Sequence, residues 1–355
     1  MQRYNLALIG FGGVNRAIAE LIRDEHARFE SELEIALRVV AITDLEFGSL
    51  VQDDGIDLAA ILSMPQGATF ASLPGGDDEP RNEWVIKNCA ADIVMEATFT
   101  IPTDGEPALS HIRWALESGK HVATTNKGPV ALHSSALKAL AADHGVRFEF
   151  EGAVMSGTPV LRLAHRMLKG LRVSEIEGIL NGTSNYVLGR MEQGLTLDEA
   201  IAEAQQLGYA EADPTADLGG SDVRLKVAIL ANEVLGARIS VDDVVTIGIE
   251  GISAEQIRIA AQEGRRWKLL GSVRFDGDGA VKAVVSPAAL PADHPLAGIS
   301  GPTNAISFTT DLLGSVMVSG PGAGKMETAY ALLSDIIAIH QNEGQRWSGD
   351  TERLV

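Results

Sequence analysis

Short apolar runs alternate with amphipathic segments over the first 150 residues, and this alternation constrains the fold more than any other feature of the sequence. The apolar runs, which predict buried strands, cover residues 4–9, 33–43, 92–98, 121–124 and 146–150. Helical periodicity falls between them, most clearly over residues 14–28 and 110–118. Such an alternation is typical of an α/β fold with a doubly wound parallel sheet. We therefore expect one such domain over residues 1–150.

A glycine-rich turn joins the first predicted strand to the first predicted helix. It reads Gly10-Phe11-Gly12-Gly13-Val14-Asn15. Glycines at positions 10 and 12 allow a tight turn and a close approach of the backbone to a pyrophosphate, which the helix N-terminus then attracts. This indicates a Rossmann-like dinucleotide site. The third glycine of that pattern is replaced by Asn15, so we expect the helix to lie slightly further from the strand. Taken alone, the turn fits a plain strand-turn-helix equally well.

Asp44 ends the second predicted strand, where an acidic side chain can accept hydrogen bonds from the ribose hydroxyls of a dinucleotide. No arginine follows it directly, and this favours NAD over NADP. The alternative reading is an aspartate that caps a turn at the end of a strand. Lys127 follows the strand at 121–124, at the strand end where ligands bind in open α/β folds, and the pair Gly128-Pro129 predicts a rigid turn beside it. A solvated lysine is the alternative there.

The pattern changes after residue 150. Strands are expected near 171–180, 280–285 and 305–310, and helices over 186–191, 197–207 and 222–235. These elements predict an α+β domain over residues 151–314. A glycine-rich turn then leads into an amphipathic helix that runs to about residue 340. We expect this C-terminal segment, about residues 315–345, to pack back on the first domain and complete it.

Two polar segments of the second domain carry candidate chemistry. Residues 181–185 form a dense polar turn (NGTSN) before a helix, which suits a small polar ligand; the alternative is a helix cap by Thr183 or Ser184. Further on, Asp222 and Lys226 lie four residues apart on one helix face. Such pairs are usually solvated at a surface. Here the helix is apolar nearly all round, which indicates burial, and a buried lysine suits proton transfer.

The overall charge and composition exclude some classes of partner. The formal net charge is −19, and nucleic acids or anionic membranes require clustered Lys and Arg instead. Apolar runs reach only about ten residues, short of the ~20 that span a bilayer. Cys89 is the only cysteine. We expect a soluble protein of the cytoplasm that binds neither nucleic acid nor membrane.

The polar segments also resemble the motifs of one enzyme family. The stretch GILNGTSNY at 178–186 is similar to the most specific motif of the homoserine dehydrogenases. The stretch GYAEADP at 208–214, followed by Asp217, Asp222 and Lys226, matches their second motif, and NKGP at 126–129 matches a third. Order and spacing agree from about residue 5 to residue 340. The chain is thereby identified as a member of this family.

This resemblance implies an NAD(P)-dependent interconversion of L-homoserine and L-aspartate 4-semialdehyde, in the biosynthesis of threonine, methionine and isoleucine. It gives Lys226, Lys127 and Asp222 catalytic roles, with Lys226 as the proton donor or acceptor. Glu211 would bind the substrate amine. The remaining residues that it places at the substrate are Asp217, Gly182, Thr183 and Tyr209.

The resemblance implies three further features. The cofactor, NAD or NADP, would contact Gly10, Phe11, Gly12, Gly13, Val14, Asn15, Asp44, Thr98, Lys127 and Gly324. A sodium ion would be held by Glu151 and by the carbonyls of Val154, Ser156 and Thr158. The chain would act as a homodimer. We expect this chain to lack the C-terminal regulatory extension that many members carry, and with it feedback inhibition through such a domain. Two alternatives remain: a different small amino or hydroxy acid as substrate, or a dinucleotide-binding sensor with an inactive site.

Overall fold

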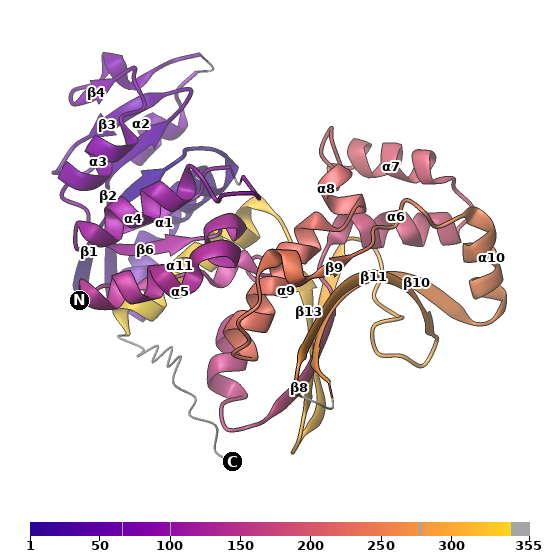
Figure 1. The fold of residues 1–355 in the computed structure, drawn as a ribbon. Coiled ribbons are helices and arrows are strands. Elements are labelled where there is room, and N and C mark those ends of the chain that lie inside the picture. Colours follow the sequence, from indigo (N-terminus) through magenta and orange to yellow (C-terminus); the bar gives the residue numbers. More distant parts are fainter. Residues whose placement is uncertain (66, 100, 277–278, 342–355) are drawn as a thin grey trace. The chain divides into compact units, whose positions relative to one another are not determined.

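The computed structural model describes residues 1–65, 67–99, 101–276 and 279–341. It divides into two compact units (Figure 1). Unit 1 comprises Met1–Ala153 together with the segment that begins at Gly324, and unit 2 comprises Val154–Ala323.

Unit 1 is built on a seven-stranded sheet in the order β4-β3-β2-β1-β5-β6-β7. Its strands are β1 (Gln2–Ile9), β2 (Ile35–Asp44), β3 (Gly48–Val51), β4 (Gly76–Asp77), β5 (Ile93–Glu96), β6 (His121–Thr124) and β7 (Phe148–Glu149). The five strands from β2 to β7 in this order are parallel, whereas β3 and β4 add an antiparallel edge. The chain leaves β1 toward β2 on one side and returns to β5 on the other. The carboxyl ends of β1 and β5 therefore form the switch point at which open α/β sheets bind ligands.

Helices cover both faces of this sheet. They are α1 (Gly13–Glu32), α2 (Leu58–Leu62), α3 (Asn82–Asn88), α4 (Ala108–Glu117), α5 (Lys127–Asp143) and α11 (Lys325–His340), with 3₁₀ turns η1 (Phe70–Ser72) and η2 (Glu151–Ala153). The C-terminal helix α11 packs along α1. The expectation for the segment 315–345 is wrong at its start, because residues 315–323 belong to unit 2, where 315–321 form part of a strand. Its final positions, 342–345, lie outside the described residues.

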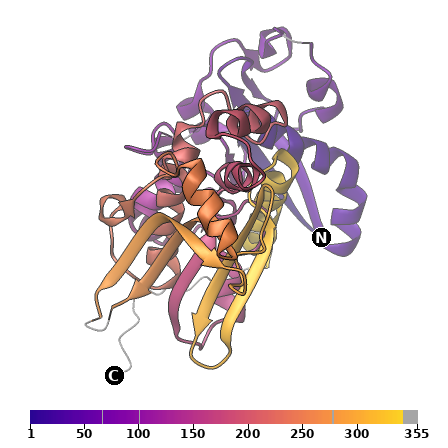
Figure 2. The ribbon, with the colours of Figure 1, turned by 90° about the vertical axis from the view of Figure 1, so that its right-hand side faces the viewer.

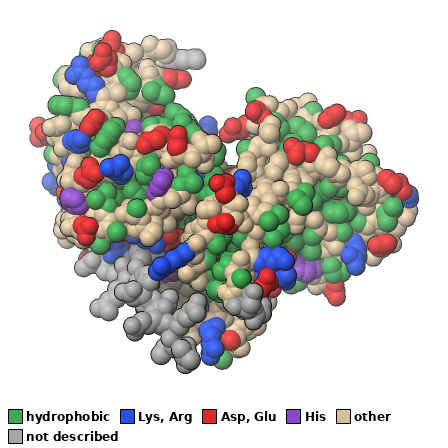
Figure 3. Space-filling view, in the orientation of Figure 1, with side chains coloured by type: hydrophobic (Ala, Val, Ile, Leu, Met, Phe, Trp, Pro, Cys, Tyr) green, Lys and Arg blue, Asp and Glu red, His purple; other side chains and the backbone are tan. Residues whose placement is uncertain are grey.

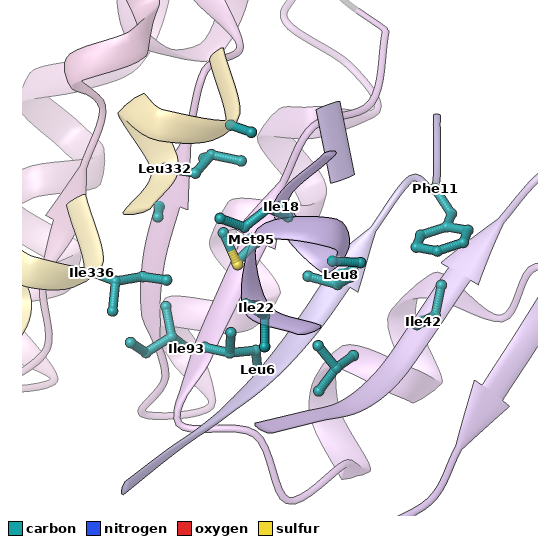
Figure 4. Packing of buried hydrophobic residues seen from close by; sticks show 14 of the residues in the cluster. Leu6, Leu8, Phe11, Ile18, Ile22, Ile42, Ile93, Met95, Leu332 and Ile336 are labelled. Carbon is teal, nitrogen blue, oxygen red and sulfur yellow. The ribbon is translucent and has the colours of Figure 1, made fainter. Parts of the chain in front are cut away.

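The core of unit 1 lies between this helix pair and the sheet (Figure 4). Leu6 and Leu8 of β1 and Met95 of β5 meet Ile18 of α1 and Leu332 of α11, all fully buried. Each such side chain stabilises the fold by roughly 1.5–3 kcal/mol relative to an exposed position. The core thus fixes the helix that follows the glycine turn to the strand that precedes it.

Unit 2 is built on a six-stranded sheet in the order β13-β12-β8-β10-β11-β9. Its strands are β8 (Val173–Ile179), β9 (Val245–Thr246), β10 (Arg265–Phe275), β11 (Val281–Pro291), β12 (Thr303–Thr310) and β13 (Gly314–Pro321). Figure 2 shows β8 between the orange hairpin β10–β11 and the yellow hairpin β12–β13. Strand β8 is paired on both sides, with β12 and β10, and leads straight into the polar turn at 181–185.

The helices of unit 2 are α6 (Gly182–Glu192), α7 (Leu197–Gln206), α8 (Thr215–Leu218), α9 (Ser221–Val234) and α10 (Ala254–Gln262), with the π-helical turn η3 (Leu163–Met167) and the 3₁₀ turn η4 (Val241–Asp243). Helices α6, α9 and α10 all pack on β10. Gly271 of β10 brings α9 close, since a Cβ there would lie only 2.6 Å from the side chain of Val227. The helix that carries Lys226 is thereby pressed onto the sheet.

Several elements differ from the sequence-based expectation. Helix α5 begins at Lys127, so Gly128-Pro129 belongs to its first turn and is not a separate rigid turn; proline suits that position because the first N–H groups have no helical partner. Residues 72–84, which are rich in turn-forming residues, contain β4 and the start of α3. Strands β10 and β13 were missed. Charged residues interrupt the first and glycines flank the second, and both owe their strand form to pairing with neighbours.

Two surface properties accompany the fold. No helix within the described residues has both the length and the apolar character needed to cross a bilayer. On the face shown in Figure 3, Asp and Glu side chains are scattered among Lys and Arg on each unit and do not gather into one patch.

Candidate functional site

The glycine turn of unit 1 has an open helix N-terminus. Gly10 adopts a left-handed conformation (φ 78°), and a Cβ there would press on the carbonyl of Ala97 at 3.0 Å. Gly12 is the N-cap of α1, no side chain caps the helix, and apart from its chain neighbours and the backbone of α1 no described atom lies within 4 Å of the position a Cβ would take. The first N–H groups of α1 are therefore accessible to an anion, as the pyrophosphate of a dinucleotide requires.

Asn15 points into the protein and not toward the turn surface. Its side chain is 1% exposed, and its Nδ2 donates to the carbonyls of Gly10 at 2.6 Å, Ile9 at 3.2 Å and Met95 at 3.3 Å. The residue that replaces the third glycine therefore ties α1 to the ends of β1 and β5.

Asp44 makes two contacts at the carboxyl end of β2. Its Oδ2 accepts from the backbone N–H of Phe11 at 2.6 Å, and its Oδ1 accepts from that of Glu46 at 2.9 Å. Asp44 thus caps the turn at the end of β2, and the same carboxylate also anchors the glycine turn. Arg16 stacks on the ring of Phe11, 4.8 Å from its centroid.

A buried carboxylate that the sequence analysis missed ends β5. Glu96 is fully buried and accepts from the N–H of Thr98 at 3.0 Å, from the Thr98 hydroxyl and from the Thr124 hydroxyl at 2.9 Å. His111 of α4 places its Nδ1 3.6 Å from the same carboxylate, and its Nε2 contacts Asn82 of α3 at 2.9 Å. The sequence does contain a signal for Glu96, because an acidic residue there ends an otherwise apolar strand.

Asn126 and Lys127 continue this polar edge. Asn126 is the N-cap of α5, and its Nδ2 donates to the carbonyls of Phe99 at 3.1 Å and Thr98 at 3.2 Å. Lys127 is the first residue of α5 and is half-buried. Since β2, β1, β5 and β6 are adjacent and parallel, Asp44, Gly10, Thr98 and Lys127 follow strand ends on one edge of the sheet.

The turn before α11 adds a second glycine and a lysine. Gly324 (φ 136°) is the N-cap of α11, and the Glu327 carboxylate lies where its Cβ would be. The aliphatic chain of Lys325 lies across Gly13, 2.9 Å from where a Cβ of Gly13 would be. Sequence analysis missed Lys325, although it directly follows a glycine-rich turn.

Lys226 of α9 carries a buried ammonium group in unit 2. It is 6% exposed, and its Nζ donates to Asp222 Oδ2 at 2.7 Å and to the carbonyl of Leu180 at 2.5 Å. Burial excludes the reading of a solvated surface pair. The lysine is held where β8 ends and α9 begins.

Asn181 joins this pair to a second carboxylate. Its Nδ2 donates to Asp217 Oδ1 at 2.7 Å and to Asp222 Oδ2 at 2.9 Å, while its Oδ1 accepts from the N–H of Ser184. Asn181 is therefore the N-cap of α6, so the alternative reading, a cap by Thr183 or Ser184, named the wrong residues. The Thr183 hydroxyl instead donates to the carbonyl of Tyr209 at 2.7 Å.

The carboxyl group of Asp217 has a pKa raised above its ordinary value of 3.8. Burial is the largest cause, and the charge of Asp222 adds to it. The hydrogen bond from Asn181, the nearby hydroxyl of Thr183 and the charge of Lys226 oppose the rise of this pKa. The cluster thus places two carboxylates and one ammonium in a partly dry environment, as proton transfer requires.

Glu211 and Tyr209 lie beside this cluster in sequence but are exposed. The carbonyls of Glu211 and Ala212 accept from Gln205 Nε2, which orders the loop. The ring of Tyr209 packs against Tyr186, with centroids 5.0 Å apart. The structure does not bring the Glu211 carboxylate into the hydrogen-bond network of Asp217.

The segment proposed for the cation has an unusual backbone. Met155 and Ser156 are both left-handed (φ 58° and 53°), a conformation that costs energy in residues other than glycine. Glu151 is buried, and the Thr158 hydroxyl donates to the carbonyl of Pro321 at 2.9 Å. Throughout the described ranges, no group of three or more His, Cys, Asp and Glu side chains could share a metal ion.

Comparison with known proteins places these features in a family. Residues 159–337 match the family model of homoserine dehydrogenase, and residues 10–151 match that of the homoserine dehydrogenase NAD-binding domain.

The chain belongs to the homoserine dehydrogenase family.

Relatives with this activity cover nearly the whole chain. The NAD(+)-dependent homoserine dehydrogenase of Pseudomonas canavaninivorans is 57% identical over 96% of this chain and 97% of its own length. The homoserine dehydrogenase of Methanocaldococcus jannaschii is 38% identical over 95% of this chain and 99% of its own. Among solved structures, a putative homoserine dehydrogenase from Archaeoglobus fulgidus has a TM-score of 0.84 at 37% identity, covering 95% of this chain and 99% of its own.

The chain is therefore an NAD(P)-dependent oxidoreductase of amino-acid biosynthesis that interconverts L-homoserine and L-aspartate 4-semialdehyde. The family resemblance noted in the motifs is confirmed, as is the α/β fold with a second sheet-containing domain.

Proposed function

We propose that Lys226 is the proton-transfer residue of this homoserine dehydrogenase and that the surrounding network binds the substrate. The observation that carries the proposal is the buried contact of Lys226 with Asp222, which Asn181 extends to Asp217. NAD(P), when bound, supplies or accepts the hydride at the substrate carbon. In aldehyde reduction, the Lys226 ammonium gives a proton to the carbonyl oxygen as that carbon gains the hydride; in homoserine oxidation, its amine takes up the hydroxyl proton.

The other members of the network orient the substrate. Asp217, Gly182 and Thr183 lie around the start of α6, and we assign them to the polar end of homoserine together with Tyr209. Glu211 would hold the substrate amine, and its exposure in the structure means that its loop would have to bring the carboxylate in. Asp222 keeps Lys226 in place. Lys127, at the N-terminus of α5, would act between cofactor and substrate.

For the cofactor, we propose NAD in preference to NADP. Gly10, Gly12 and the uncapped start of α1 fit a pyrophosphate, and Phe11, Gly13, Val14, Asn15, Thr98 and Gly324 complete the set that we assign to the dinucleotide. The side chain of Asn15 points into the protein, so this residue would act by holding the turn in place. The Asp44 carboxylate would accept from the ribose hydroxyls and repel a 2′-phosphate. The 57% identical relative is named as NAD(+)-dependent, whereas an archaeal structure at 28% identity was solved with NADPH.

We further propose a monovalent cation, sodium by family resemblance, held by Glu151 and by the carbonyls of Val154, Ser156 and Thr158. The left-handed pair Met155 and Ser156 supports this, because it turns consecutive carbonyls of one short loop in directions that regular structure does not allow. Comparing turnover in sodium-free and sodium-containing buffers of equal ionic strength tests it. Unchanged activity and unchanged thermal stability would contradict the proposal of a bound cation.

Assembly and location complete the proposal. We propose a homodimer, supported by the exposed apolar side chains of Leu312, Leu313 and Met317 on and beside the edge strand β13. Light scattering on the purified protein distinguishes a dimer from a monomer.

We also place the enzyme in the cytoplasm, since its one cysteine, Cys89, is buried and free of any disulfide.

The decisive experiment on function follows reduced nicotinamide by its absorbance, with L-homoserine and each cofactor in turn. Turnover with NAD at a higher kcat/KM than with NADP is the expected result. A preference for NADP would overturn the cofactor assignment, and equal turnover of L-serine would overturn the substrate-binding roles.

A further inference from the structure

A second buried lysine of unit 2 lies outside the proton-transfer network. Lys268, on β10, is 2% exposed. Its Nζ donates to the Oδ1 of Asn185 at 3.0 Å and to the carbonyl of Ile299 at 2.5 Å. Burying an ammonium group costs several kcal/mol even when it is paired, and an apolar side chain of similar volume would fill the space at lower cost. Stability alone therefore does not explain a lysine here.

The electrostatic surroundings of Lys268 also disfavour a buried charge at this position. Burial lowers the pKa of the Lys268 ammonium, the charge of Glu192 opposes that shift, and Arg266 adds to it. Glu192 itself has a pKa raised by burial and accepts from the backbone N–H of Trp267. Oxygens of an amide and of the backbone are the direct partners of the ammonium.

Asn185, which accepts the hydrogen bond of Lys268, also donates hydrogen bonds to the loop 299–303. It is 1% exposed in α6, and its Nδ2 donates to the carbonyls of Gly301 at 2.9 Å and Thr303 at 3.3 Å. With the bond from Lys268 to Ile299, the two side chains hold the loop at both of its ends. Ile299 also packs against the small core that contains Leu296.

The loop in turn presses on the start of α6. A Cβ on Gly182 would lie 2.6 Å from the carbonyl of Pro302, so loop backbone and turn backbone are in direct contact. Gly182 is the first residue of α6 and Thr183 the second, directly after the N-cap Asn181. A shift of the loop would therefore displace the residues that we assign to the substrate.

We propose that Lys268 is a positioning residue for homoserine, which acts through Asn185 and the loop 299–303 on the start of α6. This inference rests on the assignment of Gly182 and Thr183 to the substrate. It also explains the second asparagine of the GILNGTSNY motif, which the substrate network leaves without a role.

The test compares Lys268→Met with Lys120→Met. Lys120 is the matched control, since it is also buried and donates to a backbone carbonyl, that of Cys89, in unit 1. We expect Lys268→Met to raise KM for homoserine by roughly tenfold, because small displacements of positioning groups have large kinetic effects. KM for NAD should stay within about twofold. Lys120→Met should leave both constants unchanged at a similar loss of thermal stability. Unchanged homoserine KM in Lys268→Met, or equal rises for both substrates, would overturn the proposal.

A variant of Asn185 tests the contact between this side chain and the loop 299–303. Asn185→Asp keeps the acceptor for Lys268 and removes the donor to the loop, so it should raise homoserine KM as well; it decides the question if Lys268→Met is insoluble. In Lys268→Met and in Asn185→Asp, amide hydrogen exchange should accelerate at 182–185, 299–301 and 303, and unaltered exchange there would contradict the proposal.

Thr183→Val separates this inference from the proposed function. A raised homoserine KM in Thr183→Val with wild-type behaviour of Lys268→Met refutes only the role of Lys268. Wild-type KM in Thr183→Val refutes the substrate assignment of the turn, and with it the route by which Lys268 would act.

Discussion

The Nζ of Lys226 lies 2.7 Å from Oδ2 of Asp222, one helical turn earlier in α9, and both side chains are largely buried. The same i,i+4 spacing occurs in Glu83 and Lys87 of α3, whose side chains are 54% and 42% exposed. Identical spacing thus gives a surface pair in one helix and a candidate catalytic pair in another. Burial by the sheet, and not the pair itself, makes the difference.

This contrast predicts different costs for breaking the two pairs. Asp222→Ala leaves a buried ammonium with one carboxylate partner fewer and should lower the free energy of unfolding by roughly 3–5 kcal/mol. Glu83→Ala removes a solvated partner and should cost less than about 1 kcal/mol. Urea unfolding of both variants measures this. Equal losses would show that the Asp222–Lys226 pair is solvated.

Asp44→Asn should change the choice of cofactor. The amide oxygen can still accept from the N–H of Phe11, so the glycine turn keeps its anchor while the negative charge is lost. The ratio of kcat/KM for NAD to that for NADP should fall by roughly fivefold, since removing a repulsion of about 1 kcal/mol has this order of effect. Steady-state kinetics with each cofactor measure the ratio, and an unchanged ratio would separate Asp44 from the ribose.

Asp217→Asn should alter how stability depends on pH. Because the folded state raises the pKa of this carboxyl above 3.8, it holds a proton that the unfolded chain has already released. Wild-type stability should therefore fall as pH rises from the ordinary pKa through the raised one, and the fall should be absent in the variant. Thermal unfolding from about pH 4 to about pH 8 should show Asp217→Asn gaining relative to wild type as pH increases. A constant difference would contradict the raised pKa.

Asn15→Gly restores the third glycine of the dinucleotide fingerprint, yet it should destabilise this protein. The variant loses the amide that bonds the ends of β1 and β5, at a cost of roughly 1–3 kcal/mol. Asn88→Gly is the control, because Asn88 also donates to a backbone carbonyl from a helix but is exposed. If urea unfolding gives both variants the same loss, the buried amide of Asn15 contributes nothing.

The sequence predicted best where local pattern decides the structure. The apolar surroundings of Lys226 indicated its burial, and the strand-turn-helix at residues 4–28 was correctly located, because both follow from periodicity within one element. The contacts of Asn181 were not predictable, since Asp217 and Asp222 reach it from a distant part of the chain. The motif identified these residues as a group, but their mutual geometry comes from the packing of α6 and α9 on β10.

Buried polar residues on strands were the main omission. Glu96 and Lys268 have charged side chains, which sequence reasoning assigns to solvent, and only the neighbours supplied by other elements make their burial tolerable. For Asn15, the unusual residue was noticed in the sequence, but its structural role was not predicted. The departure from the glycine pattern was visible in the sequence, but the direction of its side chain depends on the adjacent ends of β1 and β5.

The most direct test of the account is turnover of L-homoserine by Lys226→Ala, measured together with homoserine binding by calorimetry. If Lys226 transfers the proton, kcat should fall by about 10²–10⁴-fold, while the dissociation constant for homoserine stays within a few-fold of wild type. Wild-type turnover in this variant would contradict the assignment and remove Lys226 from the mechanism.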